Sequence, residues 1–184
     1  TVFWGNTYPA GPFTLLADNW EVTVDEVLTN ADQKLEVPWY DSRTDFKANV
    51  SINNWNLNNT VQDLSGLSRG WSVLGRKDQI TELKGWSGLS GVTSMEGMLK
   101  GQSRLERVSI TEANMPNLTS TVNMFSGCTN LTEVDLSGWT GMESPAITGM
   151  FTNAPANINL TADNDAIGTA IKEEYEKNTS SVRK

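Results

Sequence analysis

The sequence predicts an α/β repeat solenoid built from short strands and short helical returns. The first observation is a recurring phrase of two apolar residues separated by one residue, which is followed by Trp in three copies. The steps between the equivalent anchor positions are 31, 27, 26 and 24 residues, and a period in this range is typical of solenoids. The anchors are Ile52, Leu83, Ile110, Leu136 and Leu160.

The second observation is a phrase of different spacing between the anchors. Val92, Met95 and Met98 stand three residues apart, and segments 61–67 and 147–150 repeat this spacing. A period of three indicates a tight helical or 3₁₀ turn, whereas a period of two indicates a strand. One such unit cannot bury its apolar face alone, so neighbouring units stack. We therefore expect four to five repeats over residues 49–162.

The best-preserved copy carries a family resemblance. Residues 131–136 have the L-x-x-L-x-L form of a leucine-rich repeat. Together with segments 92–99 and 124–139, they make the chain resemble BspA-like leucine-rich repeat surface proteins, in the Met- and Trp-bearing subtype common in mycoplasmal lipoproteins and Gram-positive surface proteins. The resemblance covers residues 50–160. It implies a leucine-rich-repeat-like right-handed coil and a secreted or cell-surface bacterial protein associated with adhesion.

One feature departs from ordinary leucine-rich repeats. The position after the strand, where Asn or Cys usually ties successive turns together, is held here by Trp55, Trp86, Ala113 and Trp139. A ladder of stacked indoles that is interrupted at Ala113 is our hypothesis for this position. The six Met residues lie between residues 95 and 150, and we interpret them as core filler.

Both ends of the repeat region are expected to be capped. Residues 1–48 lack the repeat, and the alternation in 20–24 and 35–39 predicts a β-hairpin in a β-rich N-terminal cap. At the other end, Asp163 or Asp165 is expected to cap a helix over residues 166–177, because an apolar stripe follows at helical spacing. Residues 163–184 are thus interpreted as a C-terminal capping helix with a frayed tail.

Composition argues against several classes of function. The chain has 184 residues, no His and one Cys, which excludes Ser-His-Asp and Cys-His catalytic pairs and the usual zinc sites. Its net charge is −8, which is unfavourable for nucleic-acid binding. No apolar run approaches the roughly 18 residues that cross a bilayer, so no membrane insertion is expected. We expect no enzyme, no cofactor and no metal.

Two motifs received a structural interpretation. Asp163, Asp165 and Glu174 imitate the spacing of an EF-hand loop, but Ile167 occupies the fifth position and helix capping explains both Asp residues. Cys128 stands in a small-residue segment with no basic neighbour or His partner. We therefore expect it to be a buried apolar side chain and not a nucleophile.

The candidate ligand face is the surface of the strands that carries the polar side chains. Its side chains alternate with the buried ones, and most of them are small and polar. The predicted first row is Ser51, Glu82, Ser109, Asp135 and Asn159. The predicted second row is Asn53, Lys84, Thr111, Ser137 and Thr161, and Arg107 and Glu133 extend the face.

Three functions fit these features of the sequence. The first is a non-enzymatic module that binds a protein or another host extracellular ligand through the repeat face. The second is a carbohydrate-binding module in which Trp4, Tyr8, Trp39 and Tyr40 of the N-terminal cap stack on sugars. The third is a structural spacer in a larger surface protein.

Overall fold

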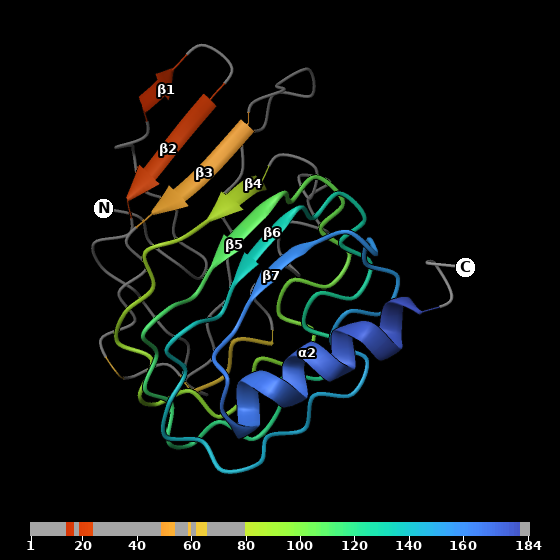
Figure 1. Ribbon diagram of the computed structural model, residues 1–184. Coiled ribbons are helices and arrows are strands. Elements are labelled where there is room, and N and C mark those ends of the chain that lie inside the picture. Colours follow the sequence, from red (N-terminus) through yellow and green to blue (C-terminus); the bar gives the residue numbers. More distant parts are fainter. Residues whose placement is uncertain are drawn as a thin grey trace.

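A computed structural model describes residues 14–16, 19–23, 49–53, 59, 62–65 and 80–180. Within them, seven strands form one sheet in chain order, β1 to β7, and one helix, α2, follows the last strand (Figure 1). The strands are β1 (Thr14–Leu16), β2 (Asn19–Thr23), β3 (Asn49–Asn53), β4 (Ile80–Leu83), β5 (Arg107–Ser109), β6 (Glu133–Asp135) and β7 (Asn159–Thr161). The predicted α/β character is confirmed.

Strands β2 to β7 pair with one another in parallel, whereas β1 pairs with β2 antiparallel. Val108 lies opposite Val134, and Val134 lies opposite Leu160, so successive units here are 26 residues long. Strands β5, β6 and β7 are three residues long, and the left-handed residues Glu112 and Gly138 follow β5 and β6 closely. The sheet therefore grows by one short strand per unit.

Further parallel contacts join the units away from the sheet. A chain of single parallel bridges runs through Asp63, Ser94, Ser120 and Ala146. Backbone N–H and C=O groups at and beside these residues bond from one unit to the next. Asn114 and Thr140 form another bridge, one turn beyond the strands. Successive units are thus hydrogen-bonded at several places outside the sheet. These bonds give partners to backbone N–H and C=O groups that the short strands do not pair.

Where short helical or 3₁₀ returns are predicted, the described residues form single tight turns with hydrogen bonds between residues three apart, and no helix of more than one turn forms in that part. The segment after Ser94 is a series of turns in which Met98 N–H donates to Met95 C=O at 3.1 Å and Lys100 N–H donates to Gly97 C=O at 3.1 Å. Gly97 and Gly101 have φ values of 61° and 79°, which end any helix after one turn. The period of three in the sequence arises from successive tight turns.

The first strand of the predicted N-terminal hairpin forms near residue 20. It is β2, which pairs antiparallel with β1 and parallel with β3. Residues 35–39, the second strand of the predicted hairpin, lie outside the described part of the chain. The boundary of a separate cap at residue 48 stays a prediction.

The core lies between the sheet and the turns. The Met side chains at 95, 98, 115, 124 and 150 are fully buried, which confirms them as core filler. Phe125 stacks on Phe151 with ring centroids 5.3 Å apart, and Phe151 meets Tyr175 edge-on at 5.1 Å. An aromatic stack thus runs from Phe125 through Phe151 to Tyr175 of the helix.

Helix α2 (Ala166–Thr179) confirms the predicted C-terminal helix. Asp165 is its N-cap, and its Oδ1 accepts a hydrogen bond from Gly168 N–H at 2.8 Å. Ile171 and Tyr175 are buried, so the helix closes the apolar core at the end of the stack. Tyr175 also accepts from Ile158 N–H at 2.9 Å and donates to Pro155 C=O at 2.8 Å through its hydroxyl.

The helix also supplies hydrogen-bond acceptors that an additional unit would supply. Phe125 N–H donates to the Met150 carbonyl at 2.8 Å, and at the same position of the last unit Phe151 N–H donates to Asn178 Oδ1 at 2.9 Å. The backbone N–H groups of the last unit would otherwise be left without the partners their counterparts have. A side-chain amide of α2 replaces a backbone carbonyl here.

Two carboxylates act in the same way. Asn123 N–H donates to the Thr148 carbonyl, and its counterpart Gly149 N–H donates to Glu174 Oε2 at 3.0 Å. Asp163 Oδ2 accepts from Gly138 N–H at 3.1 Å, directly before the helix. Asp163 and Glu174, two acidic residues of the EF-hand-like motif, therefore accept hydrogen bonds at the C-terminal end of the stacked units. The third, Asp165, is the helix N-cap.

Candidate functional site

The polar face of the sheet carries two rows of side chains around a buried central row. Val108 and Val134 are buried at the centre of their strands, and the residues on either side of them point away from the core. The first row of paired positions is Ser51, Glu82, Arg107, Glu133 and Asn159. In the second row Ser109 pairs with Asp135 and Asp135 pairs with Thr161.

These rows correct the predicted register at two strands. Leu83 pairs with Val108 and not with Ile110, and Val134, not Leu136, is the next member of the row. Ser109 and Asp135 therefore belong to the second row, and Arg107 and Glu133 take their places in the first row. The cause is the turn before Trp, which is two residues shorter in 83–86 than in 134–139.

The remaining predicted residues lie at the margins of this face. Thr111 and Ser137 follow their strands and are half-buried, and Ser137 N–H donates to Asp135 Oδ1 at 3.0 Å. Asn159 and Thr161 are exposed on the last strand. For Ser51 and Asn53 the structure describes only the backbone, which places them on β3.

Opposite charges alternate at the centre of the face. Glu82 Oε2 accepts from Arg107 Nε at 2.9 Å, and Glu82 Oε1 lies 3.3 Å from Lys84 Nζ. Arg107 also lies 3.3 Å from Glu106. The hydrogen bond to Glu82 raises the pKa of Arg107, partial burial opposes this shift, and the charges of Glu82 and Glu106 add to it. Such half-exposed pairs contribute little to stability but define a charge pattern.

A hollow of about 160 Å³ lies within this charge pattern. It is open to solvent, and the buried residues Leu83 and Val108 line its base. Its walls are six of the predicted ligand-face residues, which the sheet brings together from three neighbouring strands and the turn after β4. They are Glu82, Lys84, Arg107, Ser109, Glu133 and Asp135.

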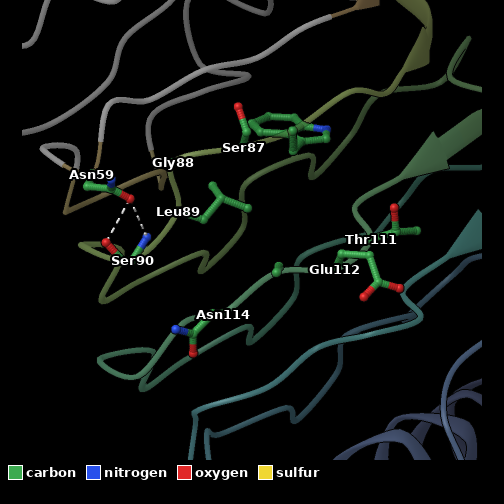
Figure 2. Close-up of a pocket in the computed structure, with 10 residues that line it drawn as sticks. Asn59, Ser87, Gly88, Leu89, Ser90, Thr111, Glu112 and Asn114 are labelled. Carbon is green, nitrogen blue, oxygen red and sulfur yellow. Dashed lines mark hydrogen bonds between the residues drawn. The ribbon is translucent and has the colours of Figure 1, made fainter.

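A larger hollow of about 570 Å³ lies beyond the strands, where the chain turns away from the sheet. Figure 2 shows Asn59 and Ser90 on one side of it and Thr111 and Glu112 on the other, with Leu89 and Asn114 between them in this view. Ser90 donates to Asn59 Oδ1 through its hydroxyl at 2.7 Å and through its N–H at 3.3 Å. Of the described residues that line this hollow, only Thr111 is a predicted ligand-face residue, and the interrupted Trp position at Ala113 is the sequence feature that coincides with the hollow.

The Trp position itself is interior. Trp86 and Trp139 are 7% and 2% exposed, and Trp139 Nε1 donates to the Ile110 carbonyl at 2.7 Å. Trp55 lies outside the described residues, so the indole ladder interrupted at Ala113 stays a prediction. Trp139 ties its own unit to the preceding one by this bond, which is the role that Asn or Cys has in ordinary repeats.

Cys128 is fully buried, as predicted. Burial raises the pKa of its thiol to about 12, and a contact with the Gln102 backbone opposes this shift. The thiol Sγ donates to the Leu99 carbonyl at 3.1 Å. This environment keeps the thiol protonated and unreactive at neutral pH.

Neither a metal cluster nor a bilayer-spanning helix occurs in the described part of the chain. No group of three or more Cys, Asp or Glu side chains there is arranged to hold a metal ion. The one helix of the same part, α2, lacks the length and apolar character that a bilayer crossing requires.

Comparison with known proteins assigns the C-terminal part of the chain, from β4 to α2, to one family. No curated protein and no solved structure matches the chain. Residues 73–181, which include β4 to β7 and α2, match a family described as "Mycoplasma protein of unknown function, DUF285". The family's association with Mycoplasma points to a bacterial source. The chain therefore belongs to the DUF285 family.

Proposed function

We propose that this chain is a non-enzymatic binding module of a bacterial surface or secreted protein, and that it binds a protein ligand through the polar face of the sheet. The observation that carries the proposal is the hollow on that face, whose walls include two basic and three acidic side chains. Alternating charges around a shallow hollow favour a partner with the complementary pattern and speed its association. A flat, uniformly neutral surface would offer no such selectivity.

We also propose that the fold is a BspA-like, leucine-rich-repeat-like right-handed solenoid. Parallel strand pairing, the chain of parallel bridges and the 26-residue step support this interpretation. Parallel connections of this kind are right-handed in nearly all proteins. A crystal structure of the chain would test the proposal, and a left-handed connection or an open, untwisted sheet would contradict it.

The binding proposal is tested with an array of immobilised extracellular-matrix proteins and with charge-reversed variants. Lys84→Glu and Glu133→Lys change the sheet face, whereas Lys100→Glu and Glu96→Lys are matched controls at exposed positions on the turns. We expect the wild type to bind at least one array member, the first two variants to bind it at least tenfold more weakly, and the two controls to bind unchanged.

Thermal unfolding of each variant separates lost binding from lost folding. All four positions lie at the surface, so we expect melting temperatures close to that of the wild type. Equal binding by the sheet-face variants would rule out this face. A wild type that binds no array member would favour the structural spacer over the binding module.

The surface location is a separate proposal that rests on the family's association with Mycoplasma and on the resemblance of the repeats. Proteolysis of intact cells that produce the protein tests it. We expect an externally added protease to remove the protein, and protection until the cells are lysed would contradict the proposed location.

A further inference from the structure

The hollow on the polar face of the sheet lies at a small residue between two longer ones. Ser109 on β5 stands between Lys84, which directly follows β4, and Asp135 on β6. Its short side chain leaves open the space that a longer residue would fill. Leu83 and Val108, at the base of the hollow, are 0% and 2% exposed, so their side chains lie in the core and the strand backbone forms the floor.

The size of this hollow fits one side chain of a partner protein. It measures about 160 Å³, whereas sites for small molecules commonly measure about 300 to 1,000 Å³. Side chains that fill such pockets near the centre of an interface dominate its binding free energy, and Trp, Tyr and Arg are the most frequent among them. The charges around the hollow distinguish between these three.

The two basic side chains of the hollow are already paired within the sheet. Arg107 Nε donates to Glu82 Oε2 at 2.9 Å, and Arg107 Nη1 donates to Glu106 Oε2 at 3.3 Å. Lys84 Nζ lies 3.3 Å from Glu82 Oε1. Arg107 also stands opposite Glu133 in the ladder, but its guanidinium group bonds to the other two carboxylates. Basic and acidic charges therefore offset each other on the β4 side of the hollow.

The β6 side of the hollow is acidic. Glu133 and Asp135 flank the buried Val134, so both side chains leave the sheet on its polar face. Among the described residues, which include the strands on both sides of β6, neither carboxylate forms an ion pair. Asp135 Oδ1 accepts from Ser137 N–H at 3.0 Å. This side of the hollow is thus complementary to a cation.

An arginine side chain suits this arrangement better than the other two anchors or a lysine. Glu133 and Asp135 are two residues apart on one strand, so their Cα atoms are separated by about 7 Å. A guanidinium group presents five N–H donors in a planar fork and can bond to two carboxylates at once. A lysine ammonium is a single point charge, and Trp or Tyr would leave both carboxylates without a counter-ion.

We propose that this hollow receives one arginine side chain of the partner protein, and that its guanidinium group bonds to Glu133 and Asp135. The inference rests on the binding function proposed above and gives the chemistry of the partner at that site. The chain's net charge of −8 favours the approach of a basic partner surface.

An NMR titration of the whole chain with short peptides tests this chemistry. The probe is the acetylated and amidated peptide Gly-Ser-Arg-Ser-Gly, and the comparators carry citrulline, lysine or glutamate in place of arginine. Citrulline resembles arginine in shape but has no charge. We expect the arginine peptide to shift the backbone amide signals of Ser109, Glu133 and Asp135, the lysine peptide to bind at least threefold more weakly, and the other two to cause no shift. No shift from the arginine peptide, or equal shifts from the citrulline peptide, would overturn the proposal.

Variants then locate the site. Ser109→Leu fills the hollow without a change in charge, and Thr129→Leu is the matched control at an exposed turn position. Glu133→Gln removes a charge and keeps the shape, with Glu96→Gln as its control on the turns. We expect the first variant of each pair to bind the arginine peptide at least threefold more weakly and both controls to bind it like the wild type. Undiminished binding by Glu133→Gln and by a folded Ser109→Leu would overturn the proposal.

Competition on the array of extracellular-matrix proteins separates this inference from the proposed function. We expect the arginine peptide, and not the citrulline peptide, to displace the chain from the array protein that it binds. If Lys84→Glu weakens that binding but the arginine peptide does not compete, the face binds its partner through other contacts and only the arginine assignment is overturned. If Lys84→Glu and Glu133→Lys both leave the binding unchanged, the function of the face is overturned and this inference with it.

Discussion

Cys128 shows how strongly a single buried position is determined by its neighbours. Its thiol is enclosed by the core and donates to the Leu99 carbonyl at 3.1 Å, and burial raises its pKa to about 12. The raised pKa means that the protonated form persists far above neutral pH. A thiolate is the reactive form of cysteine, so reactivity is suppressed in the folded state.

We expect Cys128 in the native protein to react with a disulfide reagent such as 5,5′-dithiobis(2-nitrobenzoate) at pH 8 on the order of a hundredfold more slowly than after unfolding. Absorbance of the released thiolate measures both rates. The same protein in guanidinium chloride is the control, since unfolding restores an ordinary thiol pKa of about 8.5. Equal rates in the two states would contradict the buried placement.

Glu112 gives a second prediction at the residue scale. Its left-handed backbone is disfavoured for a residue with a Cβ, by about 1 to 2 kcal/mol. Replacement by Gly relieves this strain but increases the entropy of the unfolded chain. We expect Glu112→Gly to raise the free energy of unfolding by about 0.5 to 1 kcal/mol, measured by chemical denaturation. Gly138→Ala is the comparison of opposite sign, and a less stable Glu112→Gly would contradict the strain.

Helix α2 is the element whose sequence pattern and structure agree most closely. An Asp followed by an apolar stripe at helical spacing predicts both its start and its buried side, and the N-cap bond at Asp165 supports that start. Local hydrogen bonds and spacing within one segment determine these features. They need no knowledge of distant residues.

Strand register and the helical returns are less predictable, because both depend on contacts between units. Val108 and Ile110 are both buried and apolar, so the pattern alone fits either one as the partner of Leu83. The left-handed residues Gly97 and Gly101 convert the period of three into turns, and only the backbone angles reveal this. The hollow at Ala113 depends in the same way on the neighbouring unit.

The N-cap of α2 gives a prediction at the scale of the element. Asp165→Ala removes the acceptor of Gly168 N–H, and we expect the free energy of unfolding to fall by about 1 kcal/mol. Asp165→Asn keeps an acceptor oxygen and is the matched control, with an expected loss of a few tenths. Urea denaturation measures both, and equal losses would show that the charge, not the cap, is important.

The acceptor side chains of α2 give another prediction. Glu174→Leu leaves Gly149 N–H without its acceptor in a half-buried site, so we expect a loss of about 1 to 3 kcal/mol in the free energy of unfolding. Glu174→Gln retains an acceptor oxygen and should lose clearly less. Hydrogen exchange of the Gly149 amide checks the mechanism directly: unchanged protection in Glu174→Leu would contradict it.

At the scale of the whole molecule, the fold is a series of units in which each hydrogen-bonds to the next. Parallel bridges and strand pairs carry these contacts through β4 to β7, and α2 closes the series. Stability in such an arrangement comes mainly from contacts between neighbouring units. Loss of a terminal unit therefore exposes a strand edge and apolar surface together.

We accordingly expect a chain that ends at residue 162 to lose α2 and to aggregate, because the edge of β7 and the aromatic stack become exposed. Size-exclusion chromatography measures the soluble monomer. A chain that ends at residue 180 retains the helix and is the control. A stable, soluble monomer without α2 would contradict the role of the helix as the closing element.

The acceptors on α2 also bear on how a protein of this kind can change in length. Glu174 and Asn178 on the helix, and Asp163 directly before it, offer side-chain oxygens where the next unit would offer carbonyls, so the C-terminal segment is matched to a repeating set of donors. An in-frame duplication of one 26-residue unit would present the same donors to the helix. Descendants of one gene could then differ in length by whole units while sharing one closing helix, so that recombination extends the polar face of the sheet without a change in the helix.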